Sequence, residues 1–146
     1  MKLKMIDVEK IEEYDDHLFL NTGSPHYVKF VDDVQKVDVF NKGKEIRNSE
    51  KYKSEGTNVN FVSLEENGIS VRTYERGVED ETFSCGTGSV ASAIAFYKTN
   101  NISYSKIPIK TLGGNLEVSF KEKENKYTEV FLKGPAKLVF KGEMVI

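Results

Sequence analysis

The alternation of hydrophobic and polar residues predicts a chain built mostly of short β-strands. Apolar residues recur at alternate positions in residues 58–64 and 69–75, as in strands that place one side against a core. Asn67-Gly68 lies between these two segments and is the strongest short hairpin signal in the chain. Further strands are predicted, between turn-rich segments, at residues 3–8, 17–21, 27–31, 102–111, 115–121, 127–133 and 136–140.

One segment has a different pattern. Residues 90–97 are small or apolar on almost every face, which predicts a helix enclosed by other structure. This helix is expected to open at Cys85 and to stop near residues 99–101. Residues 33–47 mix valines with charged residues, so a strand and a short irregular helix broken at Gly43 both remain open. The acidic residues 12–16 are expected to form a turn.

These elements predict an α+β fold in which a mostly antiparallel, curved sheet or barrel wraps around one central α-helix, because that arrangement best buries an apolar helix. An open doubly wound α/β fold would need several helices, and only one is convincing. The 146 residues match the usual size of one domain. We therefore expect residues 1–146 to form a single domain.

Composition narrows the choice of partners. The chain has 21 basic and 23 acidic residues with both signs mixed, so no nucleic-acid or membrane partner is predicted. No apolar run approaches the roughly 18 residues of a membrane span, and residues 1–5 lack a signal-peptide pattern. A single cysteine forms no internal disulfide, which suits a reducing, cytoplasmic location and leaves Cys85 free for chemistry.

Cys85 is the main candidate for that chemistry. A helix start leaves backbone N–H groups unpaired and carries partial positive charge, so the amides of Gly86 and Thr87 can receive an anion. The same field is expected to lower the pKa of the Cys85 thiol, so that it can act as a base or nucleophile. The alternative is that Cys85 is a small core residue, because free cysteine is often buried.

Other polar residues are expected near this thiol. The hairpin brings Glu75 and Arg76 to the end of the sheet from which the segment before Cys85 departs. Arg76 suits a carboxylate, Asn58 an amine or carboxylate, and Glu75 the thiol proton or a substrate ammonium. His26 stands at a turn-to-strand junction, from which it is easily positioned toward a cleft. Taken singly, His26 is more readily interpreted as a hydrogen-bonded surface residue than as a functional one, and Arg76 is at least as readily interpreted as a solvated charge at a strand end.

Several familiar sites are excluded. Residues 86–91 match the pattern of a dinucleotide-binding loop, but repeated βαβ units and an acidic residue in 101–116 are lacking. No Gly-Lys-Ser/Thr follows the glycines, so a P-loop is excluded as well. One cysteine and two scattered histidines predict no metal site. A cysteine hydrolase with Cys85 as nucleophile and His26 as base stays open, because spacing alone does not test it.

The motifs resemble the diaminopimelate epimerase family, and specifically its C-terminal half. The similarity runs in order along essentially the whole chain, and the pairing of Glu-Arg-Gly-Val with Cys-Gly-Thr-Gly is specific. The segments that carry it are Gly23-Ser24-Pro25-His26, Asn58-Val59-Asn60-Phe61-Val62, Arg72-Thr73-Tyr74-Glu75-Arg76-Gly77-Val78, Thr82-Phe83-Ser84-Cys85-Gly86-Thr87-Gly88, Gly113-Gly114-Asn115-Leu116, and residues 134–142.

The resemblance implies a cofactor-free epimerase that inverts a carbon bearing an amine and a carboxylate, with diaminopimelate as the small-molecule substrate. Two cysteines on opposite faces of that carbon exchange its proton. In this reading Cys85 resembles the second cysteine, Glu75 its supporting carboxylate and His26 the partner of the first cysteine. The remaining implied site residues are the substrate contacts Asn58, Arg76 and Ser24, and the carboxylate cradle formed by the amides of Gly86 and Thr87.

Three departures from the family pattern matter. Ser24 stands where the family usually has Asn, and residues 79–81 contain an apparent one-residue insertion. The other cysteine is missing, so the chain by itself is expected to be inactive. We therefore expect half of a two-domain enzyme, with an exposed apolar face for the missing N-terminal domain and a possible homodimer through that face. A different two-base racemase or isomerase of this fold, related to proline racemase or the phenazine-pathway isomerase, and a non-catalytic carboxylate-binding module are the alternatives.

Overall fold

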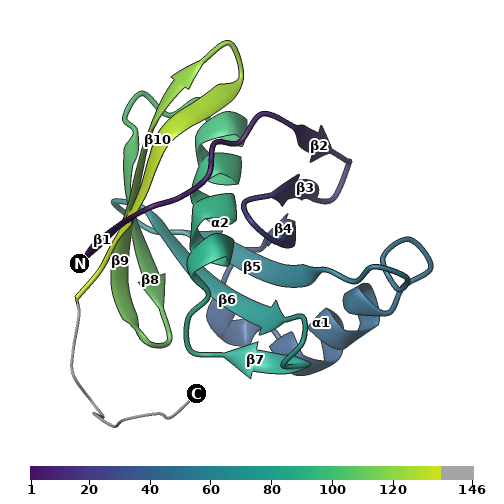
Figure 1. Ribbon diagram of the computed structural model, residues 1–146. Helices are drawn as coiled ribbons and strands as arrows, with labels where there is room; N and C mark the ends of the chain where they lie inside the picture. Colours follow the sequence, from purple (N-terminus) through teal and green to yellow (C-terminus); the bar gives the residue numbers. More distant parts are fainter. Residues whose placement is uncertain (136–146) are drawn as a thin grey trace, which may run out of the picture.

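The computed structural model describes residues 1–135 as a ten-stranded sheet curled around helix α2 (Figure 1). The strand order is β1-β10-β9-β8-β6-β5-β4-β3-β2, and β7 pairs with β6 outside this path. The strand predicted at residues 136–140 lies outside the described residues. The elements are β1 Lys2–Lys4, β2 Ile11–Glu13, β3 Leu18–Asn21, β4 Pro25–Phe30, a 3-10 turn Val34–Lys36, α1 Val39–Arg47, β5 Asn58–Leu64, β6 Ile69–Glu75, β7 Asp80–Thr82, α2 Gly86–Thr99, β8 Lys106–Thr111, β9 Gly114–Lys123 and β10 Lys126–Lys133.

The sheet is mostly antiparallel, with parallel pairing only at β4–β5 and β6–β8 among the described strands. A parallel pair needs a crossover connection. Here each crossover contains a helix, because α1 lies between β4 and β5 in the chain and α2 lies between β6 and β8. The predicted fold, a mostly antiparallel curved sheet around one central helix, is confirmed.

The hairpin and the central helix lie where the sequence predicts them. β5 and β6 pair antiparallel, with Leu64 opposite Ile69 next to the turn that contains Asn67-Gly68. Helix α2 begins directly after Cys85 and ends at Thr99, with Asn100 as the C-cap residue, and its residues 88–96 are all buried. Burial on every side explains why this helix shows no polar face in the sequence.

A second helix, α1, covers the opposite face of the sheet (Figure 1). Val59 and Phe61 of β5 and Tyr74 of β6 pack in the core under α1, whereas Val62 packs in the core around α2. Both sides of β5 are therefore buried, so that residues 58–63 all lie in the interior. The alternation correctly groups Val59 with Phe61, but it does not reveal that the second side is covered as well.

Gly43 does not break a helix, contrary to one of the two interpretations of residues 33–47. It lies inside α1 and is buried, and a Cβ atom added there would collide with the side chain of Tyr74. Glycine thus allows α1 to approach β6 closely. The helix begins after Asp38, whose carboxylate accepts a hydrogen bond of 3.2 Å from the backbone N–H of Asn41.

The sequence pattern does not predict the two short strands β2 and β7, because most of their residues are acidic or polar. β2 lies partly within the expected turn 12–16 and pairs with β3 at one edge of the sheet. β7 pairs with the end of β6, and Glu81 of β7 receives two hydrogen bonds, of 2.6 and 2.7 Å, from the guanidinium of Arg72. Elsewhere only the boundaries differ, since β1 ends at Lys4 and β8 begins at Lys106.

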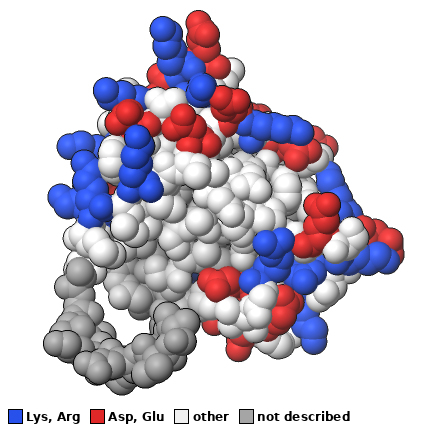
Figure 2. Space-filling model, in the orientation of Figure 1, with Lys and Arg blue, Asp and Glu red and all other residues white. Residues whose placement is uncertain are grey.

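The surface has an uneven charge distribution on the face drawn in Figure 1. Charged side chains gather along the upper, upper left and right borders of this face, while a broad area in its middle carries none (Figure 2). Within residues 1–135, neither helix has the length and apolar character needed to cross a membrane.

Candidate functional site

Cys85 lies at the start of α2, as predicted. It is the N-cap residue, with an extended backbone (φ −130°, ψ 111°), and its side chain makes no capping hydrogen bond to the first turn. The residue is partly buried, and its Sγ lies 3.6 Å from the hydroxyl oxygen of Thr87. The thiol is therefore held at a helix start beside polar groups, and it is not a fully buried core side chain.

The expected lowering of the Cys85 pKa is wrong for this chain. Burial raises the pKa of the thiol, because the thiolate loses solvation, and the negative charge of Glu75 adds to the rise. The nearby Thr87 hydroxyl and Gly88 amide act in the other direction and lower the pKa. The prediction considered the field of the helix start and not the partial loss of water around it.

His26 lies on β4 and is completely buried, so it faces neither an open cleft nor solvent. Its Nε2 lies 2.8 Å from Oγ1 of Thr87, and its Nδ1 lies 2.9 Å from Nδ2 of Asn60. Burial, with a smaller contribution from the charge of Arg76, lowers the pKa of His26 to about 3. The imidazole is therefore neutral at physiological pH.

Asn60 belongs to this cluster, although the sequence did not single it out. It is completely buried and lies next to Gly88, where an added Cβ would approach Asn60 Oδ1 to 2.5 Å and both Cys85 Sγ and His26 Cε1 to 3.3 Å. Gly88 is thus required for the close approach of α2 to these groups. A signal was present, because Asn58 and Asn60 are two residues apart and therefore share one side of β5.

Asn58 is buried, and its amide is already occupied within the chain. Its Nδ2 donates to the hydroxyl of Ser24 at 2.7 Å and to the carbonyl of Pro25 at 2.9 Å, and its Oδ1 accepts from the backbone N–H of Arg76 at 2.8 Å. Asn58 thereby ties the turn before β4 to the end of β6. In this arrangement the amide has no free donor, whereas the Ser24 hydroxyl donates to no acceptor among the residues that the structure describes.

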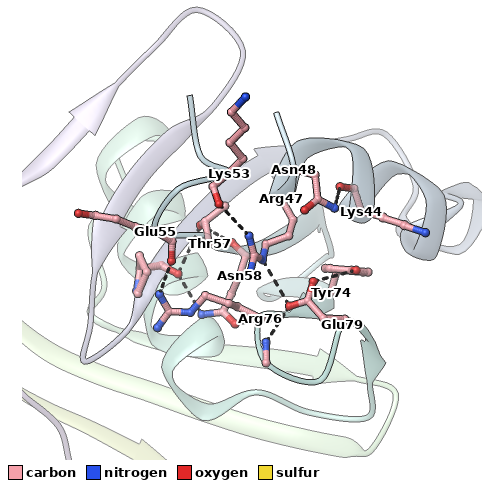
Figure 3. A network of polar contacts seen from close by, with 12 residues as sticks. Lys44, Arg47, Asn48, Lys53, Glu55, Thr57, Asn58, Tyr74, Arg76 and Glu79 are labelled. Carbon is pink, nitrogen blue, oxygen red and sulfur yellow. Dashed lines mark hydrogen bonds and ion pairs between the residues drawn. The ribbon is translucent and has the colours of Figure 1, made fainter. Parts of the chain in front are cut away.

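Glu75 and Arg76 lie at the end of β6, as the hairpin predicted. The Glu75 carboxylate raises the pKa of the Cys85 thiol, and it accepts a hydrogen bond of 3.4 Å from Oγ1 of Thr82. Arg76 donates from Nη1 to the carbonyl of Glu55 at 3.0 Å, which anchors one side of its guanidinium to the loop before β5 (Figure 3). Within residues 1–135 the rest of the guanidinium has no other acceptor, so it can bind one from outside this part of the chain.

The acidic segment of residues 79–81 is held in place close to these residues. The carboxylate of Glu79 accepts a hydrogen bond of 2.9 Å from the N–H of Gly77 and pairs with Arg47 of α1 at 3.3 Å (Figure 3). Gly56 fits between the side chains of Arg47 and Arg76, each within 3 Å of where its Cβ would lie. Glu79 therefore links this segment to α1.

The fold brings all the predicted site residues to one end of the sheet, at the start of α2. Thr22, also missed from the sequence, joins them by donating from Oγ1 to the Thr87 carbonyl at 2.7 Å. Among residues 1–135, no group of three or more His, Cys, Asp or Glu side chains could hold a metal ion. The gathered residues are Ser24, His26, Asn58, Glu75, Arg76, Cys85, Gly86 and Thr87. They combine a thiol, a carboxylate, a guanidinium and helix-start amides, a set suited to moving a proton next to a bound carboxylate.

Known structures share this fold. The probable proline racemase from Agrobacterium radiobacter K84 superposes on 90% of this chain with a TM-score of 0.59 at 12% identity. A phenazine biosynthesis protein of the PhzF family from Enterococcus faecalis superposes on 84% of this chain with a TM-score of 0.56 at 18% identity. The match covers 48% of the former and 42% of the latter. At these identities the similarity concerns the fold.

Sequence comparison identifies the family. The family model of diaminopimelate epimerase matches residues 18–139. The diaminopimelate epimerase of Flavobacterium psychrophilum is 49% identical over 96% of this chain and 55% of its own length, and that of Aquifex aeolicus is 45% identical over 87% of this chain and 45% of its own. The chain thus spans about half the length of the curated relatives it matches. Since the family match includes most of its residues, the chain belongs to the diaminopimelate epimerase family.

Proposed function

We propose that this chain is the C-terminal half of a cofactor-independent diaminopimelate epimerase, which interconverts LL- and meso-diaminopimelate for lysine and cell-wall precursor synthesis. Membership of the family and the half-length match to its curated relatives support this proposal. The observation that carries it is the position of Cys85 as the N-cap residue of α2, next to Glu75 and to the hydroxyl of Thr87.

The proposed reaction moves one proton on each face of the substrate Cα. The Cys85 thiolate removes the hydrogen on its own face and becomes a thiol, leaving the electron pair on a carbanion next to the carboxylate. A second thiol, from the half that this chain lacks, gives its proton to the opposite face and becomes a thiolate. In the reverse direction the roles of the two thiols exchange. Glu75 would exchange a hydrogen bond with Cys85 as the charge on the sulfur changes.

The raised pKa of Cys85 is compatible with this role. A group that must return a proton as readily as it removes one should not be held permanently as thiolate. In this chain burial favours the thiol, and a bound substrate with a second domain would change that environment further. The proton transfer is then controlled by the positions of the donors around the sulfur.

Substrate binding would use the positive groups around the thiol. The guanidinium of Arg76 can bind a carboxylate with two hydrogen bonds, and the amides of Gly86 and Thr87 can hold the carboxylate next to the reacting carbon. The Ser24 hydroxyl can donate its free hydrogen to the substrate. Asn58 would act by holding Ser24 and Arg76 in place, because its own donors are occupied.

The test is to restore the complete site. This chain would be combined with the N-terminal half of the Flavobacterium psychrophilum relative and incubated with diaminopimelate in D₂O. Exchange of the α-hydrogen is expected from the complex and from neither half alone. The matched control is Cys85→Ser, which should still form the complex but lose exchange. A folded complex without exchange would contradict the proposal.

Two alternatives are separated by the same complex. Turnover of proline or hydroxyproline in place of diaminopimelate would indicate another two-base racemase of this fold. Carboxylate binding that survives Cys85→Ser without any turnover would indicate a non-catalytic module. The cysteine hydrolase is disfavoured, because both ring nitrogens of His26 are occupied by Asn60 and Thr87 and its ring is buried.

A further inference from the structure

The orientation of the Asn60 amide determines which groups donate and which accept in the hydrogen bonds around His26. The backbone carbonyl of Tyr27 lies 3.1 Å from Nδ2 of Asn60, and a carbonyl can only accept. The hydroxyl of Thr73 donates to Oδ1 of Asn60 at 2.7 Å, in agreement with the same amide orientation. The second hydrogen of Nδ2 therefore points to Nδ1 of His26, at 2.9 Å.

This contact decides which nitrogen of His26 carries the proton. Nδ1 must offer its lone pair to Asn60, so the neutral ring carries its hydrogen on Nε2. Nε2 lies 2.8 Å from the Thr87 hydroxyl oxygen and donates to it. The hydroxyl hydrogen of Thr87 is then free to point to Cys85 Sγ, 3.6 Å away. In this series of hydrogen bonds, Asn60 donates to His26, His26 donates to Thr87, and Thr87 donates to the sulfur of Cys85.

We propose that Asn60 and Thr87 are positioning residues, which hold His26 as its Nε2–H tautomer and thereby direct a hydroxyl hydrogen at the sulfur of Cys85. His26 then acts as a fixed neutral donor to Thr87 and takes no proton from the thiol. The hydrogen bond from Thr87 stabilises Cys85 when its sulfur is a thiolate. The inference deepens the proposed function, on which it rests only for the role of Cys85 as a proton-transferring group.

The surroundings favour a fixed arrangement. Asn60 and His26 are completely buried and Thr73 is nearly so, which excludes water from these three residues, while Thr87 is partly buried. Gly88 leaves no space for an added side chain between Asn60, His26 and Cys85. The charged groups that face this chain of donors are Glu75, which opposes a negative sulfur, and Arg76, which opposes a positive imidazole.

The first experiment measures the pKa and the accessibility of the Cys85 thiol in the unchanged protein, and it requires no catalytic turnover. Since Cys85 is the only cysteine, the rate of alkylation by iodoacetamide reports on it alone. The midpoint of the rate against pH gives the thiol pKa, and the plateau at high pH gives its accessibility. Thr87→Val removes the hydroxyl. At pH values below the midpoint, this variant should have a thiolate fraction about tenfold smaller than that of the unchanged protein. Thr87→Ser, which keeps the hydroxyl, should behave like the unchanged protein.

The second experiment observes His26 directly by ¹⁵N NMR of the imidazole ring. The His17→Gln variant leaves His26 as the single histidine. Between pH 5 and pH 8 we expect a neutral ring with the proton on Nε2, and Asn60→Leu should allow the other tautomer to appear. A proton on Nδ1 in the unchanged protein would overturn the proposal. An unchanged alkylation midpoint in Thr87→Val, or an equal shift in Thr87→Ser, would overturn it as well.

These outcomes are distinguishable from failure of the proposed function. Hydrogen exchange by the reconstituted complex tests whether Cys85 transfers protons to and from diaminopimelate. Alkylation and the ring tautomer need neither the substrate nor the other half. The donor chain can therefore be present in a protein without epimerase activity, and an active epimerase can lack it.

Discussion

At the residue scale, the main feature is a neutral histidine enclosed by polar neighbours. His26 makes hydrogen bonds through both ring nitrogens and has no exposed surface. A buried group that stays neutral in the folded state but takes a proton in the unfolded chain makes stability depend on pH. His26 thus has an effect on folding that can be measured separately from any activity.

The sign of this effect follows from the two pKa values. The pKa of His26 is about 3 in the folded protein, against 6.5 as the ordinary value. As the pH falls below 6.5 the unfolded chain binds the proton first, so the stability is complete above 6.5 and decreases toward pH 3. Between pH 7 and pH 5 we expect His26 to account for a loss of about 2 kcal/mol in the free energy of unfolding.

Urea unfolding of the unchanged protein and of His26→Asn at both pH values measures this contribution. The variant should be less stable at pH 7, but its stability should decrease less on acidification. His17→Gln is the matched control, because it removes the other histidine and should keep the steep dependence. Equal pH dependence in the unchanged protein and His26→Asn would contradict the assignment.

At the scale of elements, α1 shows packing prevailing over local propensity. Glycine is a poor helix former, yet Gly43 lies within α1 because the helix contacts Tyr74 of β6 at this point. The same contact brings α1 over one side of β5 and β6. The Asp38 cap and the Tyr74 contact together explain a helix that the pattern of residues 33–47 left undecided.

Gly43→Ala distinguishes the two influences by the sign of its effect. Helix propensity alone would stabilise the protein by about 1 kcal/mol. We expect a loss of about 1–3 kcal/mol instead, because the new methyl group overlaps the Tyr74 side chain. Urea unfolding measures the change. Lys42→Ala, at an exposed neighbouring position, is the control, and its free energy of unfolding should change by no more than about 0.5 kcal/mol. A stabilised Gly43→Ala protein would show that α1 can move away from β6.

At the scale of the whole molecule, the site lies beside exposed apolar surface. Phe83, two residues before Cys85, is 78% exposed, and Leu112 is 48% exposed. The two lie close together, because the N–H of Gly113 donates to the Phe83 carbonyl at 2.9 Å. Large exposed aromatic side chains near a site are typical of surfaces that bind a partner. The missing half would cover this surface under the proposed function.

Phe83→Ser should therefore weaken assembly with the N-terminal half of the Flavobacterium psychrophilum relative by about tenfold or more, because burial of a phenylalanine contributes about 1.5–3 kcal/mol. Titration calorimetry measures the affinity. Leu64→Ser is the control, since Leu64 is 56% exposed at the opposite end of β5 from Asn58. Equal loss in both variants, or in neither, would contradict this docking surface.

The sequence by itself determined the elements whose pattern is local. The β5–β6 hairpin depends on Asn67-Gly68 and the alternation on both sides of it, and α2 on a run of small apolar residues after Cys85. The family motifs are also present in the sequence, and they predict which residues gather at the start of α2. Acidic β2 and β7 were missed, because sheet pairing overrides their low strand propensity.

Only the tertiary structure decided which polar groups meet. His26, Asn60 and Thr87 are separated in the chain by 34 and 61 residues as counted from His26, and their contacts exist only because the sheet curls around α2. The direction of those hydrogen bonds depends on the Tyr27 carbonyl, which no pattern of residue types reveals. The pKa of Cys85 was likewise decided by burial, because the solvation of a thiol depends on everything that surrounds it in space.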